Sequence, residues 1–598
     1  MAHRGPDDSG TYIDADNSVY FAHRRLSILD VTDAGHQPMA SNDGSVVVVY
    51  NGEIYNFLEL REDLARKGRI FQTSSDTEVL IQAYAEWGMD CLSRFNGMFA
   101  FALWDRSRKK LFLARDRIGV KPLYLLEGPH GLMFASEVKT FKALPEVSFT
   151  ADEELVPVFL RDGYVTGERT FFRKVRKLMP GHFMEVSDGG VAVRKYWELS
   201  YKTEDGIVEA EWEERLSALL IESVNLRLRS DVPVGVLLSG GLDSTTIVAL
   251  LEGKSDIPTK TFSVAYQLGE DFDETPYARL AARRYRTEHH EYYVTPKEFR
   301  DFIPQYVWHM DEPVSEAAGI SLYYISRLAR EHVTVVLSGE GSDELFAGYD
   351  IYRYMLWIET LRNAVGPFLR GRGRIAKFLG HRGERIRKYM NLAALPMEER
   401  YRGVNLLSQI ELEGVCQNAV EGRMGSPEEY WHQTFSSGRG WAPLNRLLYA
   451  DTKTWLVDDI LIKADKMTMA NSLELRVPFL DYRVVELAAS MNPSLKLRHG
   501  EKKYILKRIM RKKVPEKILR RPKMGFPTPI ALLFRGPLNG YLREILLDSR
   551  TQSRGYFDRR GVEGAINLHE QGVDRSQLIW RMLVLEEWHR VFVDGGTY

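Results

Sequence analysis

The sequence is poor in cysteine and has no long apolar run. Cys91 and Cys416 are the only cysteines among 598 residues, too few for a disulfide framework or a cysteine-rich metal site and typical of a reducing compartment. No apolar run approaches the roughly 18 residues of a membrane span, and the N-terminus lacks the basic and apolar regions of a secretory signal. We therefore expect a soluble, cytoplasmic protein that does not bind a membrane.

An excess of charge of one sign is also absent. Lys and Arg number 81 and Asp and Glu number 82, which gives a formal net charge of -1. This balance excludes a global attraction to nucleic acid, to an anionic membrane or to an acidic substrate. Two local stretches, residues 369–390 and 506–523, are strongly basic, but charge runs on helices are usually solvated faces. We predict no nucleic-acid partner, and a steep salt dependence of RNA binding would contradict this prediction.

The hydrophobic pattern predicts a mixed fold, α+β in the first part and α/β in the second. Up to about residue 200, short apolar or alternating runs such as "SVVVVY", "MFAFALWD" and "KLFLARD" predict antiparallel sheets with two helices between them. This pattern of short apolar and alternating runs ends near residue 200. Beyond it, continuous apolar runs such as "VPVGVLL" and "VTVVL" alternate with helices, which is typical of a parallel sheet covered on both faces. We predict domains at residues 1–200 and 201–598.

Two small-residue loops carry the strongest chemical signal. In "VGVLLSGGLDSTTIVAL" a buried-type strand runs through residues 239–244 into a helix, and "VTVVLSGEGSDELFAGY" repeats this arrangement at residues 338–344. Such loops bind anions through backbone N–H groups and the helix dipole, and in a parallel sheet both would lie at its carboxyl edge. Asp243 and Asp343 are then candidate Mg²⁺ ligands. The alternatives are an ordinary strand–helix turn and solvated helix N-caps.

These loops, with "MDEPVSEAAGISLYYIS" and "DDILIKADKMTMANSLELRVPFLD", resemble the synthetase domain of glutamine-dependent asparagine synthetases over most of residues 205–530. Upstream, "HRGPDDSG", "FAHRRLSILD", "YNGEIYNFLELR" and "RDRIGVKPLYL" resemble the N-terminal-nucleophile glutaminase domain of the same family. The resemblance implies an antiparallel α/β/β/α glutaminase sandwich at residues 1–200. A helix-rich pyrophosphate-loop ATPase with a parallel sheet would follow at residues 201–598.

The resemblance implies an enzyme that uses ATP and Mg²⁺ to adenylate the β-carboxylate of aspartate, after which ammonia displaces AMP. Asp243 and Asp343 would hold Mg²⁺. Glu340 would support adenylate formation and take a proton from ammonia, and Lys466 would face the developing phosphate charge, with Lys523 as a weaker candidate. The implied ATP-binding residues are Leu238, Ser239, Gly240, Gly241, Asp243, Ser244, Val264, Ser338 and Gly339.

By the same resemblance, the first half would bind glutamine. The implied residues are Arg25 at the α-carboxylate, Asn51 and Gly52 as oxyanion hole, and Glu53 and Asp76 near the α-amine. The family attacks glutamine with an N-terminal cysteine, which this sequence lacks. Cys91 and Cys416 are expected to be buried structural thiols. We expect the first strand of the sandwich to be absent and the chain as given to use ammonia only. Either it starts at an internal Met of a longer gene, or it is an ammonia-dependent relative.

Other interpretations stay open at this point. Relatives amidate or cyclise other carboxylates in surface-polysaccharide or antibiotic pathways, and a non-catalytic member would keep the fold without binding ATP. Glu474, Arg476 or Glu316 are candidates for holding the acceptor. A tunnel with apolar walls would carry ammonia between the halves, and a homodimer is suggested by analogy with the family.

Overall fold

The computed structural model describes the chain except for residues 129–130, 145–146, 148, 255–256, 267–272, 370–391, 405–406, 408, 413, 418–428, 523–527 and 596–598. Most of the first basic stretch and Lys523 therefore lie outside the described residues. In the part of the chain that is described, no helix combines the length and the hydropathy needed to cross a bilayer.

The N-terminal part consists of antiparallel strands, as the alternating pattern predicts. Six of them form one sheet in the order β11-β10-β6-β5-β4-β3, three form a second sheet in the order β8-β7-β9, and β1 and β2 form a hairpin. The strands are β1 (Asp8–Asp14), β2 (Val19–Arg25), β3 (Met39–Ala40), β4 (Val46–Ile54), β5 (Gly97–Asp105), β6 (Lys110–Arg115), β7 (Tyr124–Gly128), β8 (Gly131–Ala135), β9 (Val175–Lys177), β10 (His182–Ser187) and β11 (Gly190–Lys195).

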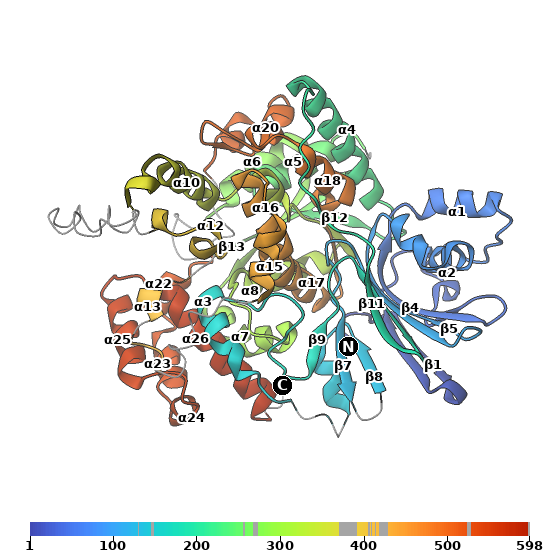
Figure 1. Ribbon diagram of the computed structural model, residues 1–598, viewed down its shortest axis with the longest axis horizontal. Coiled ribbons are helices and arrows are strands. Elements are labelled where there is room, and N and C mark those ends of the chain that lie inside the picture. The colour runs from blue at the N-terminus through green and yellow to red at the C-terminus, as the bar shows by residue number, and fades with distance from the viewer. Residues whose placement is uncertain are drawn as a thin grey trace.

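Side chains of β4 alternate between two cores and so create the layers. Val48 and Tyr50 face the core beneath α1 (Phe57–Arg66) and α2 (Asp76–Trp87), whereas Val47 and Val49 face the core shared with the second sheet and Phe21 of β2. Successive residues of a strand point to opposite faces, so an apolar strand such as "VVVV" can be buried on both sides. The result is a helical layer on two β-layers, on the right of Figure 1.

The second part contains a parallel five-stranded sheet in the order β14-β13-β12-β15-β16, which confirms the predicted parallel sheet. Its strands are β12 (Val234–Leu237), β13 (Lys260–Tyr266), β14 (Glu288–Val294), β15 (Val335–Leu337) and β16 (Glu474–Arg476). The chain moves outward from β12 to β13 and β14, and then returns to place β15 on the other side of β12. The strand order therefore reverses between β12 and β15, which is where open α/β sheets bind ligands.

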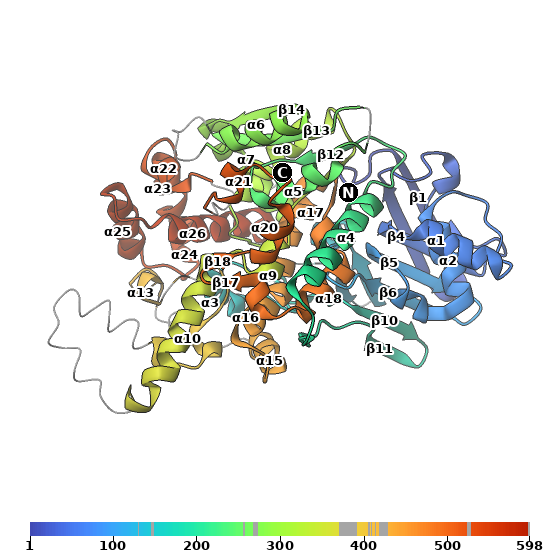
Figure 2. The same cartoon turned by 90° about the horizontal axis from the view of Figure 1, so that it is seen from above.

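Helices surround this sheet and extend beyond it, with the last ones on the left of Figure 1 and a central α17 visible in Figures 1 and 2. They are α3 (Val156–Asp162), α4 (Glu209–Arg227), α5 (Leu242–Leu251), α6 (Thr275–Tyr285), α7 (Pro296–Met310), α8 (Ala318–Arg330), α9 (Ser342–Phe346), α10 (Asp350–Leu369), α12 (Met397–Arg400), α13 (Gln409–Leu412), α15 (Glu429–Ser437), α16 (Pro443–Lys453), α17 (Ile462–Met469), α18 (Tyr482–Ser490), α19 (Pro493–Lys496), α20 (Tyr504–Met510), α21 (Glu516–Leu519), α22 (Ile530–Arg535), α23 (Asn539–Leu546), α24 (Ser549–Ser553), α25 (Arg559–Glu570) and α26 (Ser576–Trp588).

Buried ion pairs join the two parts at α17. The carboxylate of Asp311, just after α7, accepts a hydrogen bond from the Lys466 ammonium and lies 2.9 Å from Lys139 Nζ. It also accepts a hydrogen bond of 3.0 Å from the backbone N–H of Val138. Burial raises the pKa of Asp311, but the ammonium groups of Lys139 and Lys466 outweigh burial and hold it below its usual value. Asp311 is therefore an ionised carboxylate enclosed by cations from both parts of the chain.

We expect Asp311→Asn to lower the free energy of unfolding by about 3–5 kcal/mol, because the buried Lys466 loses its carboxylate partner, whereas Lys139 keeps Glu137. Urea or thermal unfolding of the purified protein measures this loss. Asp301→Asn is the matched control on α7: Asp301 pairs with Lys297 at the surface, so its unfolding midpoint should stay that of the parent. Equal midpoints for Asp311→Asn and the parent would contradict the assignment.

Candidate functional site

A cavity of about 630 Å³ opens where the strand order reverses. Both small-residue loops line it, and the second loop contributes Glu340 and Asp343. Lys463 also lines it. The predicted ATP-binding residues that line it are Leu238, Ser239, Gly241, Asp243, Ser244, Val264, Ser338 and Gly339. Gly240 belongs to the same loop but does not line the cavity. The structure thus gathers residues from three separate strand ends into one concave site.

The first loop folds as its composition predicts. Gly240 has a φ of +69°, and a Cβ at this position would lie 2.3 Å from the backbone nitrogen of Ala278 on α6, so only glycine fits here. The Ser239 backbone N–H donates to Ser244 Oγ at 3.3 Å, and the Gly241 N–H donates to Ser239 Oγ at the same distance. The loop closes directly before α5, whose N-terminal dipole favours an anion.

The two candidate metal ligands share one cation. Lys503 Nζ lies 2.7 and 2.6 Å from the two carboxylate oxygens of Asp243 and 2.7 Å from Asp343 Oδ1. Glycine allows this approach, because a Cβ on Gly339 would lie 2.8 Å from Asp243 Cβ and a Cβ on Gly348 would lie 1.7 Å from Asp343 Oδ1. Two carboxylates that already share one cation form a donor set that suits Mg²⁺ together with phosphate oxygens.

Sequence reasoning did not identify Lys503. It stands directly before α20 with a φ of +52°, and no local motif marks it, because it meets Asp243 and Asp343 only in the folded chain. A lysine next to two acidic loop residues can neutralise them or contact a phosphate. Lys503 is therefore part of the candidate site.

Lys466 does not line the cavity. Its side chain is completely buried in the ion pair with Asp311 and lies 4.9 Å from the ring of Tyr124. Lys463, in the first turn of α17, faces the cavity instead. Burial lowers the pKa of Lys463, but nearby carboxylates, chiefly Glu316 and Glu340, outweigh burial and raise it. The cavity therefore receives an ammonium group from α17, but from a different residue than the motif suggests.

The three residues predicted to hold the acceptor, Glu316, Glu474 and Arg476, do not lie in one site. Glu316 lines the cavity, close enough to Lys463 to influence its pKa. Arg476 is completely buried, with Nε 2.8 Å from Glu474 Oε1 and Nη2 3.0 Å from Glu53 Oε1 on β4. Glu474 and Arg476 thus bind the two parts of the chain together, and only Glu316 is placed to meet a ligand next to the small-residue loops.

A second cavity, of about 1330 Å³, lies between the β-layers of the N-terminal part. All five predicted glutamine-binding residues line it: Arg25, Asn51, Gly52, Glu53 and Asp76. The Arg25 guanidinium also donates to the backbone carbonyls of Leu29 and Thr32 at 3.1 Å, which holds it against the chain. The structure therefore brings together residues that are distant in the sequence.

Burial sets the charge state of the acidic residues in this second cavity. Asp76 Oδ2 accepts the Tyr50 hydroxyl and the Ile54 N–H, both at 2.9 Å. Burial outweighs these hydrogen bonds and raises the pKa of Asp76 to about 6. Burial, with the neighbouring carboxylates Asp76 and Glu474, also raises the pKa of Glu53 against the opposing effect of Arg476.

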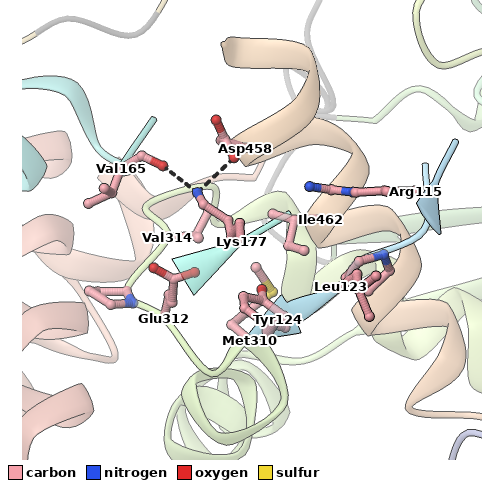
Figure 3. Close-up of a pocket in the computed structure, with 12 residues that line it drawn as sticks. Arg115, Leu123, Tyr124, Val165, Lys177, Met310, Glu312, Val314, Asp458 and Ile462 are labelled. Carbon is pink, nitrogen blue, oxygen red and sulfur yellow. Dashed lines mark hydrogen bonds and ion pairs between the residues drawn. The ribbon is translucent and has the colours of Figure 1, made fainter. Parts of the chain in front are cut away.

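A small polar pocket lies between the parts (Figure 3). Lys177 Nζ of β9 donates to Asp458 Oδ1 at 2.8 Å and to the Val165 carbonyl at 3.0 Å, with Glu312 on the opposite wall. Its volume of about 10 Å³ approximates one water. Burial raises the pKa of Glu312. The pocket therefore combines these charged groups with apolar lining from both parts of the chain.

Comparisons with known proteins assign a family description to each part of the chain. Residues 215–590 match the family profile described as asparagine synthase, and residues 1–197 match the glutamine amidotransferase domain. The chain belongs to the asparagine synthase family.

Three curated relatives show how far the similarity extends. Asparagine synthetase [glutamine-hydrolyzing] 1 of Bacillus subtilis is 36% identical over 607 residues, covering 99% of this chain and 93% of the relative. The protein named "Putative asparagine synthetase [glutamine-hydrolyzing]" of Mycobacterium tuberculosis is 37% identical over 623 residues, covering 100% of this chain and 93% of the relative. Amidase chyE of Penicillium rubens is 28% identical over 617 residues, covering 95% and 89%.

We expect Lys503→Met to raise the affinity of the nucleotide-free protein for Mn²⁺, a stand-in for Mg²⁺ at oxygen ligands. The substitution removes the cation that competes for Asp243 and Asp343 and leaves two like charges close together. A titration followed by electron paramagnetic resonance measures the affinity. Lys507→Met is the matched control, since Lys507 lines the same cavity but pairs with Glu501. Unchanged Mn²⁺ affinity in folded Lys503→Met would refute the shared-cation arrangement.

Proposed function

We propose that the protein is an ATP-dependent amide ligase of the asparagine synthetase type. It converts aspartate, ATP and glutamine or ammonia to asparagine, AMP and pyrophosphate through a β-aspartyl-adenylate. The observation that carries this proposal is the pairing of two small-residue loops, with Asp243 and Asp343 on one shared cation, at the point of the parallel sheet where the strand order reverses.

The proposed chemistry has two displacements. A β-carboxylate oxygen of aspartate attacks the α-phosphorus of ATP and pyrophosphate leaves. Ammonia then attacks the acyl carbon and AMP leaves, while Glu340 takes the surplus proton. The loop at residues 239–244 and the start of α5 hold the pyrophosphate, and Leu238, Val264 and Ser338 frame the adenosine. Mg²⁺ bound by Asp243 and Asp343 supplies positive charge that neutralises the phosphates.

Cationic side chains complete the site. Lys463 lies on the cavity wall with Glu340 and Glu316, so in this proposal it faces the developing phosphate charge, a role that the family motif suggests for Lys466. Lys503 moves from the paired carboxylates to a phosphate when nucleotide enters. Lys466 keeps α17 in place through Asp311.

For the N-terminal part we propose glutamine binding in the second cavity. Arg25 meets the α-carboxylate, Asn51 and Gly52 form the oxyanion hole, and Asp76 and Glu53 meet the α-amine. The finer classification, an N-terminal-nucleophile sandwich at residues 1–200 followed by a synthetase domain at residues 201–598, belongs to this proposal. The β1–β2 hairpin supports it: among the described strands the hairpin has no ladder to the second sheet, and the cavity lies between the layers.

Neither Cys91 nor Cys416 is placed to attack glutamine. Cys91 and Cys416 are both buried, as expected from the sequence, and neither lines the glutamine cavity. Burial also raises the pKa of the Cys91 thiol far above neutrality, which removes its nucleophilicity. We propose that the protein acts in the cytoplasm and forms a homodimer.

A second candidate function keeps the chemistry and changes the acceptor. The similarity to amidase chyE, whose name gives an activity other than asparagine synthesis, extends over 95% of this chain and is the observation that favours this candidate. Formation of AMP with a carboxylate other than aspartate would favour this candidate.

The test is to incubate the chain with Mg-ATP and aspartate and to follow AMP and asparagine. We expect both products with ammonium. Asp343→Asn should lower kcat by roughly 100-fold or more, because a group that stabilises phosphate charge is lost; Asp301→Asn on the surface of α7 should match the parent. Absence of AMP from a folded sample with either nitrogen source would overturn the aspartate assignment.

Glutamine affinity should weaken as the pH falls through about 6, because protonation of Asp76, whose pKa is about 6, removes the charge that meets the α-ammonium group. Calorimetric titration with glutamine between about pH 5 and about pH 7 measures this change. Asp76→Asn should bind weakly at every pH, whereas Asp105→Asn, a substitution at a carboxylate remote from this cavity, should follow the parent. A pH-independent affinity in the parent would contradict the role of Asp76.

A further inference from the structure

Outside both cavities, three metal-ligating side chains meet at the amino edge of the parallel sheet. Glu288 and His290 lie two residues apart on β14, so their side chains share a face. His332 follows α8 and precedes β15. One ligand atom from each of the three residues lies within 4.8 Å of the other two. The nucleotide cavity adjoins the opposite, carboxyl edge, so this cluster is separate from the proposed catalytic centre.

The cluster is held in place by aromatic packing and one hydrogen bond. The rings of His290 and His332 stack with centroids 4.1 Å apart, and the buried ring of Phe262 on β13 lies beside both, 5.4 Å from the centroid of His290 and 5.9 Å from that of His332. His290 Nε2 lies 2.9 Å from Glu288 Oε1. The His332 backbone N–H donates to the Ala329 carbonyl at 2.9 Å, which fixes its position at the end of α8.

The donor set is that of a transition metal. Two imidazole nitrogens and one carboxylate oxygen match the ligands that Zn²⁺ takes in proteins, with a fourth position for water. Mg²⁺ and Ca²⁺ prefer oxygen ligands alone. A divalent ion would bring the Glu288 carboxylate and one nitrogen of each imidazole to a common centre, for which the two stacked rings would have to turn toward each other.

We propose that Glu288, His290 and His332 form a binding site for one Zn²⁺-type ion that ties β14 to the end of α8. β14 is the edge strand of the parallel sheet and has one strand neighbour in the described chain. α8 packs on both β13 and β14. A metal at this place therefore cross-links the exposed edge of the sheet to the helix that covers it.

The experiment uses the full chain, freed of metal by chelation and kept in excess Mg²⁺ so that the oxygen site is occupied. Titration with zinc chloride alone should give one ion per chain and raise the melting temperature, because the ion binds only the folded state. His332→Ala and His290→Ala should lose at least about 10-fold in affinity and should lose the thermal shift.

His289→Ala is the matched control. His289 is the neighbour on β14, and its ring contacts Thr261 on β13 and Glu291 instead of the cluster. It should bind zinc as the parent does. Glu288→Gln, which keeps the size of the side chain, tests the carboxylate without disturbing the packing. All variants are compared by their melting temperature without metal.

Equal zinc affinity in the parent and in His332→Ala, or no bound zinc in the parent, would overturn the proposal. A loss of affinity in His289→Ala as large as that in His290→Ala would also overturn it, because the binding would then belong to surface histidines in general. The ammonia-dependent activity is read separately, so these outcomes do not depend on the proposed function.

Discussion

The Asp311 carboxylate, enclosed between Lys139 of the N-terminal part and Lys466 of α17, is the contact on which the relation between the two cavities depends. Removing three such charges from water is costly, and only a closely matched geometry offsets that cost. The pairing therefore restricts how α17 can lie against the antiparallel layers. A helix held at this point has little freedom to turn its remaining side chains.

α17 has functional residues on several sides. Lys463 faces the nucleotide cavity. Asp465 Oδ2 accepts a hydrogen bond of 2.7 Å from the guanidinium of Arg4, and Arg4 lines the glutamine cavity. A second contact between the parts, Arg476 with Glu53 and Glu474, lies at the end of β16. Buried charges thus join α17 and β16 to residues that line the proposed glutamine site.

Steric constraints shape the nucleotide cavity as much as charge does. Gly339 and Gly348 have no Cβ where one would collide with Asp243 or Asp343, so the two loops can approach one cation. The polar pocket at Lys177 and Asp458 shows that the space between the parts is not purely apolar.

The sequence by itself determined the local features. Apolar alternation predicted the antiparallel strands, continuous apolar runs predicted the parallel sheet, and the loop at residues 239–244 was recognisable because its turn and the start of α5 depend on neighbouring residues. Most of the predicted ATP-binding residues line one cavity for the same reason. Tertiary structure alone decided that Lys503 meets Asp243 and Asp343, that Lys463 instead of Lys466 faces the cavity, and that His332 stacks on His290. These contacts join residues far apart in the chain, and local propensity carries no information about which distant side chains a fold brings together.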